Sequence, residues 1–300
     1  MLDPKGVYTV LPTPFTHEGD LDRASLRRVV DLFIADGAAG LVVLGATSEA
    51  ARLSDAERLE VFGTVMEHVN GRAPVVVGAT AEGLRTCLAY ARQAASAGGA
   101  GLLVSPPRAR RLDSDAVRRH FHALAAAVDL PIVIQDYPPI AGFAMEPGLL
   151  VRIAREVPAA RIVKLEDPPT PCKVARIREE ADGLRIGILG GLGGGYLLEE
   201  LIAGADGAMT GFAYPGILAD VVRKFHGGRP DEAADAFYRH VALMRFEFQE
   251  GIGVALRKEM LRRRGAIEHA GVRAPGARLD APTYAALERI LKWMGLERKG

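Results

Sequence analysis

The chain has 300 residues, of which 49% are hydrophobic and 25% charged, and this balance excludes an intrinsically disordered protein. Its 38 Lys and Arg residues against 37 Asp and Glu residues give a formal net charge of +1. Since no overall field attracts polyanions, we expect no nucleic-acid partner and no membrane association. The two cysteines, Cys87 and Cys172, lie far apart, which argues against a disulfide framework. With no long apolar run for a signal or a membrane span, we expect a cytoplasmic protein.

Short runs rich in Val, Ile and Leu recur about every 25 to 35 residues, the spacing of one strand, one helix and two turns. Each run is continuously apolar and does not alternate with polar residues, as in parallel strands buried on both faces. There are eight runs: Val7 to Val10, Leu41 to Leu44, Val75 to Val77, Gly101 to Val104, Ile132 to Ile134, Ile162 to Lys164, Ile186 to Leu189 and Gly207 to Met209.

The segments between the runs have the pattern of amphipathic helices. One such segment places Leu26, Val29, Val30 and Phe33 on one helical face and ends at Gly37. The eightfold alternation predicts an α/β protein, a (β/α)8 TIM barrel over residues 1–226, and a doubly wound open sheet is the alternative.

Beyond the barrel, after a Gly-Pro break, we expect a C-terminal helical extension over residues 227–300, packed on the barrel. Its helices are predicted at Asp231 to Gln249, Gly253 to Arg264 and Pro282 to Trp293.

Catalytic groups of a parallel barrel lie at the carboxyl ends of its strands. The sixth run places Lys164 at the end of a strand that is otherwise fit for burial. A desolvated, uncharged amine can add to a ketone and form a Schiff base. The alternative is a lysine that is merely ion-paired with Glu166 or Asp167, and the residue pattern alone favours neither interpretation.

Two small-residue loops could bind polar groups of a ligand. The turn Gly45-Ala46-Thr47-Ser48-Glu49 offers backbone N–H groups and the Thr47 and Ser48 hydroxyls to an anionic oxygen such as a carboxylate, although a simple strand-to-helix turn explains it as well. The glycine-rich loop from Gly190 to Gly195 lets backbone approach a ligand closely, but its glycine spacing does not fit a dinucleotide site.

The fifth run ends in Gln135, Asp136 and Tyr137, which places an amide, a carboxylate and a phenol at the barrel mouth. Any of them could relay a proton, while a solvated Asp136 is the plainer interpretation for that residue. The histidines lack metal-ligand spacing, so no metal site is expected, and His120 and His122 are predicted on a helix surface.

Taken together, these motifs resemble the dihydrodipicolinate synthase and N-acetylneuraminate lyase family of pyruvate-dependent Schiff-base enzymes. The resemblance spans nearly the whole chain. It rests on Pro12-Thr13-Pro14-Phe15, on Gly45-Ala46-Thr47-Ser48-Glu49, which is similar to the family's Gly-Thr-Thr-Gly-Glu turn, and on Lys164, where the family has its imine-forming lysine.

The resemblance implies a catalytic site and a ligand. Lys164, Gln135 and Thr47 would be catalytic, and the turn of Ala46, Thr47 and Ser48 would bind the carboxylate of a 2-keto acid. Tyr137, Gly191 and Met209 would contribute further to substrate binding. The covalent imine at Lys164 would replace any separate cofactor, and the chain would form a homo-oligomer, a tetramer or a dimer.

The chain departs from the synthase at several positions. Gln135 and Ala46 stand where the synthase has a proton-relaying tyrosine and a threonine, and Ile140 aligns with the arginine that binds its aldehyde substrate. A second tyrosine, after the fourth strand, is replaced by Arg108 or a neighbour. Since glutamine cannot relay a proton as a phenol does, Tyr137, a water molecule or the substrate itself would have to take over.

The sequence therefore predicts a Schiff-base lyase of a 2-keto acid. This enzyme would catalyse either aldol cleavage or condensation with pyruvate, or dehydration of a 2-keto-3-deoxy sugar acid. Two alternatives stay open: the synthase reaction with aspartate semialdehyde, and a catalytically silent barrel that binds a small carboxylate.

Overall fold

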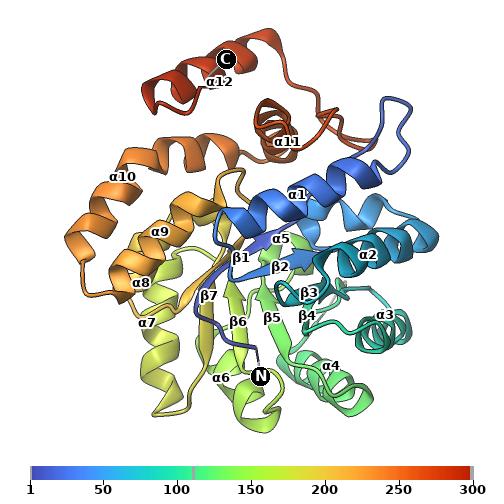
Figure 1. Ribbon diagram of the computed structural model, residues 1–300. Helices are drawn as coiled ribbons and strands as arrows, with labels where there is room; N and C mark the ends of the chain where they lie inside the picture. Colours follow the sequence, from blue (N-terminus) through green and yellow to red (C-terminus); the bar gives the residue numbers. More distant parts are fainter. Residues whose placement is uncertain (1, 110–111, 298–300) are drawn as a thin grey trace. The chain divides into compact units, whose positions relative to one another are not determined.

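The computed structural model describes residues 2–109 and 112–297, and within them eight parallel strands close into a barrel in chain order. All eight predicted runs are strands, and Figure 1 shows β5, β6 and β7 side by side. The strands are β1 (Gly6–Val10), β2 (Gly40–Val43), β3 (Val75–Gly78), β4 (Gly101–Val104), β5 (Ile132–Asp136), β6 (Ile162–Leu165), β7 (Gly187–Gly190) and β8 (Gly207–Thr210). The predicted TIM barrel is confirmed.

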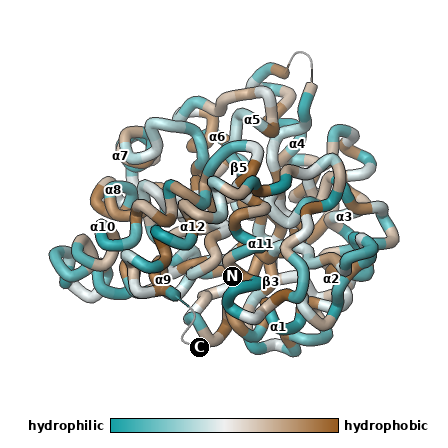
Figure 2. Tube along the Cα trace, turned by 90° about the horizontal axis from the view of Figure 1, so that it is seen from above, coloured by the Kyte–Doolittle hydropathy of each residue, from teal (hydrophilic) through white to brown (hydrophobic). Residues whose placement is uncertain are grey.

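Helices follow the strands, and three more complete the C-terminal part. They are α1 (Arg23–Ala35), α2 (Asp55–Val69), α3 (Leu84–Ser96), α4 (Ser114–Ala127), α5 (Pro138–Ala141), α6 (Pro147–Glu156), α7 (Thr170–Ala181), α8 (Leu197–Ile202), α9 (Pro215–His226), α10 (Pro230–Glu247), α11 (Gly253–Arg263) and α12 (Ala281–Trp293). Figure 2 shows repeated changes between hydrophilic and hydrophobic residues along the helical segments, as expected for helices with one buried face.

Several helices begin where a side chain can accept the unpaired N–H groups of the first turn. The Ser54 hydroxyl accepts from the Glu57 N–H, and the Glu57 carboxylate accepts from the Ser54 N–H, which makes a capping box at α2. Asp22, Asp113 and Asp280 cap α1, α4 and α12 in the simpler way. These caps fix the first turn of each of the four helices.

The chain divides into two compact units that do not coincide with the predicted boundary at residue 226. One comprises residues 1–6, 74–191 and 196–209, and the other residues 7–73, 192–195 and 210–300. The three predicted C-terminal helices are confirmed as α10, α11 and α12. The division into a barrel at 1–226 and an extension at 227–300 stays a prediction.

Within the second unit, a buried ion pair holds α11 to the turn after β2. Lys258 Nζ lies 2.5 Å from Glu49 Oε1, and both side chains are almost fully buried. Burial lowers the pKa of Lys258 to about 8, while the Glu49 charge opposes the shift. The second oxygen of Glu49 accepts the backbone N–H of Arg273. One carboxylate thus fixes a helix and a loop that are far apart in sequence.

Among the described residues, no helix is long and apolar enough to cross a membrane. The same residues contain no group of three or more His, Cys, Asp and Glu side chains that could hold a metal ion.

The prediction for His120 is wrong, whereas that for His122 is right. His120 is 5% exposed, and its Nε2 lies 3.9 Å from Cys87 Sγ of α3, because the face of α4 that carries His120 also carries Phe121 and Leu124 into the core. Burial lowers the pKa of His120 to about 4 and raises that of the Cys87 thiol to about 11. His122 is exposed and pairs with Glu156.

Cys87 should therefore resist alkylation at pH 7, because the thiolate is the reacting species and the thiol is both buried and protonated. Cys172, which is exposed on α7, should react. Mass spectrometry after iodoacetamide treatment should show one modified cysteine in the native protein and two in urea. Labelling of Cys87 in the native protein would contradict the buried position of α3.

Candidate functional site

Lys164 lies in β6, between Gln135 of β5 and Leu189 of β7 in the strand register. Its side chain is 6% exposed, and Nζ lies 2.9 Å from Oε2 of Glu166, which is itself 7% exposed. An unpaired ammonium at this depth would be strongly unfavourable, so the carboxylate is what allows the charged form to be buried. Each of the two interpretations of Lys164 from the sequence therefore describes part of the structure: the lysine is buried, and it forms an ion pair with Glu166.

Residues 164 and 166 share a face because successive side chains of a strand alternate. The same alternation turns Asp167 away, and its carboxylate pairs with Lys173 of α7 at 2.7 Å. This alternation could have been used on the sequence alone to predict that Glu166, and not Asp167, lies on the same face as Lys164.

A chain of hydrogen bonds orients the Glu166 carboxylate. Gln135 Nε2 donates to Glu166 Oε2 at 2.7 Å, and Ser105 Oγ donates to Gln135 Oε1 at 3.3 Å. All three side chains are buried. Glutamine therefore fixes the carboxylate beside the lysine, a role that differs from the proton relay of a phenol. Ser105, directly after β4, carried no signal in the sequence, because many barrel strands end in a small residue.

Gly191 lies against Glu166, and only glycine fits there. A Cβ atom added at Gly191 would lie 2.2 Å from Glu166 Cγ, far inside van der Waals contact. Its N–H donates to the carbonyl of Leu165 at 3.0 Å, so the backbone cannot move away without the loss of that hydrogen bond. The structure thus gives Gly191 a packing role beside the carboxylate, and its predicted role in substrate binding stays a prediction.

The expectation of a solvated Asp136 is wrong. Asp136 is fully buried, and its Oδ2 lies 2.6 Å from Lys173 Nζ. It neighbours Gln135 in β5, so it projects to the opposite face of the strand, where α7 covers it. Burial raises the pKa of Asp136 to about 6, against the opposing charge of Lys173.

The turn after β2 forms a short 3₁₀ helix, Ala46–Ser48, in the second unit. The prediction that the Ser48 hydroxyl is free to bind a ligand is wrong. This hydroxyl donates to the Leu11 carbonyl at 2.6 Å and accepts a hydrogen bond from the Gly45 N–H. Thr13 Oγ1 donates to the Ser48 carbonyl. Thr47 is half-buried, and its hydroxyl has no protein partner among the described residues. Carboxylate binding by Ala46, Thr47 and Ser48 stays a prediction.

Tyr137 and Met209 are the remaining residues of the predicted substrate site. Tyr137 is half-buried just before α5, the helix that carries Ile140, and Met209 is fully buried in β8. Their contact with a substrate stays a prediction.

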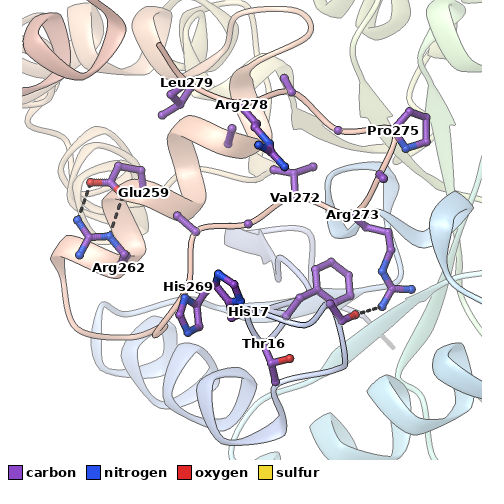
Figure 3. Close-up of a pocket in the computed structure, with 18 of the residues that line it drawn as sticks. Thr16, His17, Glu259, Arg262, His269, Val272, Arg273, Pro275, Arg278 and Leu279 are labelled. Carbon is purple, nitrogen blue, oxygen red and sulfur yellow. Dashed lines mark hydrogen bonds and ion pairs between the residues drawn. The ribbon is translucent and has the colours of Figure 1, made fainter. Parts of the chain in front are cut away.

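A cavity of about 1080 Å³ lies elsewhere, between the loop from Phe15 to Gly19, α11 and the segment before α12. Figure 3 shows Arg262 bonded to Glu259 and Arg273 bonded to a backbone oxygen, with His17 beside His269. None of residues 135–191 lines it. Two of its arginines are thus already paired, and neither Lys164 nor Glu166 lines it.

Known proteins resemble the chain over almost its whole length. The model of the dihydrodipicolinate synthetase family matches residues 3–294. An L-2-keto-3-deoxyarabonate dehydratase of Azospirillum brasilense is 32% identical over 96% of this chain and 94% of that enzyme. A 4-hydroxy-tetrahydrodipicolinate synthase of Corynebacterium aurimucosum is also 32% identical, over 97% and 94%. The crystal structure of dihydrodipicolinate synthase from Rhodopseudomonas palustris matches with a TM-score of 0.92 at 33% identity, over 97% of this chain and 99% of that one.

The closed barrel and the similarity over almost the whole chain place the protein in the class of Schiff-base lyases. The chain is a member of the dihydrodipicolinate synthetase family. Enzymes of this family use a lysine Schiff base with pyruvate, act on small keto acids and need no metal.

Replacement of Gly191 by Ala should displace Glu166 and lower turnover by about a hundredfold or more, the usual contribution of a positioned acid or base. Gly63→Ala in α2 is the matched control, because a Cβ there meets nothing within 4 Å. Steady-state kinetics and thermal unfolding of both variants separate a local from a global effect. A Gly191→Ala enzyme with normal turnover would show that the position of Glu166 is unimportant.

Proposed function

We propose that the protein is a dehydratase that forms an imine between Lys164 and a 2-keto-3-deoxy sugar acid. The observation that carries the proposal is the buried Glu166 carboxylate, 2.9 Å from Lys164 Nζ and held by Gln135. A nucleophilic amine and an acid–base group at hydrogen-bond distance are the two groups that such a reaction requires.

In the first stage, the Lys164 ammonium passes a proton to Glu166, and the free amine attacks the C2 ketone to give a carbinolamine. Glu166 returns the proton to the carbinolamine hydroxyl, which leaves as water, so the protonated imine forms and Glu166 is a carboxylate again. The positive charge on the imine acidifies the C3 protons, because electrons from the C3–H bond can move onto nitrogen.

In the second stage, the Glu166 carboxylate takes a C3 proton and an enamine forms. The protonated Glu166 then donates to the C4 hydroxyl, which leaves as water while a C3–C4 double bond forms. Hydrolysis of the imine releases the unsaturated 2-keto acid and the amine of Lys164. One carboxylate serves first as base and then as acid, so no tyrosine is needed at position 135.

The carboxylate of the substrate would bind at the turn of Ala46, Thr47 and Ser48. Support comes from the unpartnered Thr47 hydroxyl, whereas the Ser48 hydroxyl is engaged in the protein. The Ser48 N–H donates to the Gly45 carbonyl at 3.1 Å, so Ser48 would contribute by holding the turn in shape. Tyr137, Gly191 and Met209 would contribute to the same substrate site, and the covalent imine would make a separate cofactor unnecessary.

The synthase reaction is the second candidate, since relatives of both kinds are about equally similar to this chain. Aspartate semialdehyde carries a second carboxylate, and Ile140 stands where the synthase has the arginine for it. Leaving a carboxylate without a partner costs several kcal/mol, or about a thousandfold and more in rate. A silent barrel is disfavoured because a simple carboxylate-binding site has no use for a buried amine.

Two further expectations from the sequence belong here. The cysteine usage and the lack of a long apolar run would place the chain in the cytoplasm, and by the family resemblance it would assemble as a homo-oligomer, a tetramer or a dimer. One solved relative, 26% identical, is described as a monomeric variant, so assembly differs within the family, and both expectations stay predictions.

Borohydride reduction in the presence of pyruvate should attach the keto acid to Lys164, because the imine is reduced to a stable secondary amine. Peptide mass spectrometry should locate the adduct. Lys164→Ala should abolish it, whereas Lys292→Ala, an exposed change on α12, should keep it. No adduct with pyruvate or any of several other 2-keto acids would support the silent barrel.

The purified protein should lose water from one or more members of a panel of 2-keto-3-deoxy sugar acids and should condense pyruvate with aspartate semialdehyde poorly. Glu166→Gln should reduce dehydration by about a hundredfold or more, because the amide can neither accept nor return the proton. Glu179→Gln, an exposed change on α7, is the matched control. Efficient condensation without any dehydration would contradict the proposal.

A further inference from the structure

A second buried carboxyl group lies close to the lysine cluster. Glu200 of α8 is fully buried, and Thr170 Oγ1 of α7 donates to its Oε1 at 2.6 Å. Its other oxygen, Oε2, has no hydrogen-bond partner among the described residues. Within residues 2–109 and 112–297, no lysine or arginine forms an ion pair with Glu200. A buried carboxyl group with one unpartnered oxygen needs an explanation beyond packing.

Two consecutive glycines separate Glu200 from Glu166. A Cβ at Gly190 would lie 1.8 Å from Glu200 Oε2, and a Cβ at Gly191 would lie 2.2 Å from Glu166 Cγ. Consecutive residues at the end of β7 project to opposite faces, so the two carboxyl groups approach one dipeptide from its two sides. Only the bare backbone of the glycines stands between them.

The groups that face Glu200 determine when it is charged. Burial raises the pKa of Glu200 to about 7, the Thr170 hydrogen bond opposes this, and the charges of Glu199 on α8 and Glu166 after β6 raise it further. Gly190 contributes no charge from β7. Both forms of Glu200 therefore occur near neutral pH, and the negative charge of Glu166 favours the uncharged form of Glu200.

We propose that Glu200 is a positioning residue of the Schiff-base site: it holds the Gly190–Gly191 backbone against Glu166, and its carboxyl group acts on the Glu166 carboxylate across that backbone. The proposal rests on the acid–base role of Glu166 given above. As pH rises through neutrality, Glu200 gains its charge and repels the Glu166 carboxylate, which favours transfer of the C3 proton to that carboxylate. Below neutrality, Glu200 is uncharged and this assistance is lost.

A titration that needs no turnover tests the coupling. In protein labelled with carbon-13 at the glutamate carboxyl group, the resonance that disappears in Glu200→Gln belongs to Glu200. It should titrate near pH 7 in the wild type, at lower pH in Glu166→Gln and at higher pH in Thr170→Val, because these changes remove a repelling charge and a stabilising hydrogen bond. A Glu200 resonance that titrates near pH 4, or one that Glu166→Gln does not shift, would overturn the proposal.

The effect on the reaction is tested by pH profiles of kcat. The kcat of the wild type should rise by about threefold to tenfold between pH 6 and pH 8, which is an order-of-magnitude expectation for the tuning of an acid–base group. Glu200→Gln should lack this gain, Thr170→Val should shift it to higher pH, and Glu179→Gln should retain it. A Glu200→Gln enzyme with the wild-type profile would leave Glu200 only a packing role and overturn the proposal.

Failure of the proposed dehydratase reaction would be recognised separately, by the substrate panel. In that case the pH dependence of imine formation with pyruvate, measured by borohydride trapping in the wild type and in Glu200→Gln, replaces kcat. The two profiles should differ above pH 7 if Glu200 acts through Glu166 on Lys164. Identical profiles would again overturn the proposal, whatever the substrate.

Discussion

Burial of the Lys164 ammonium is the constraint on which the rest of the site depends. A charge at this depth in a barrel is stable only with a partner and a full set of hydrogen bonds. Glu166 provides the partner, and Gln135 and Ser105 complete the network around it. In the proposed reaction, the carboxylate that allows the lysine to be buried also accepts its proton. Structural need and proposed chemical use would then coincide in one carboxylate.

The backbone beside this pair shows how closely it is packed. Gly190 and Gly191 are the two residues at the end of β7 where a methyl group would meet a carboxyl group on either side. A glycine-rich segment at the end of a barrel strand can thus serve the approach of protein side chains as well as the approach of a ligand. In this chain the first of these uses is visible in the contacts.

On the opposite face of β5 and β6, a second set of charges stabilises the docking of α7. Lys173 pairs with both Asp136 and Asp167, and Asp136 is fully buried. Since the strands alternate, one face of two adjacent strands carries the candidate chemistry while the other carries the helix contacts. In the second unit, Glu49 and Lys258 perform the corresponding structural task for α11. These ion pairs are structural, although their residue types alone would also suit a catalytic site.

The sequence by itself determined the barrel, the three C-terminal helices, the special position of Lys164 and the family. Each of these depends on local information: continuous apolar runs, amphipathic patterns, or a lysine at the end of a buried run. The tertiary structure alone decided which groups meet. Gln135 and Glu166 are 31 positions apart, Thr170 and Glu200 30, and their contacts depend on strand register and helix docking, which no local pattern encodes. For the same reason Asp136 and His120 were predicted at the surface, since a polar residue reveals its burial only through the partner that the fold brings to it.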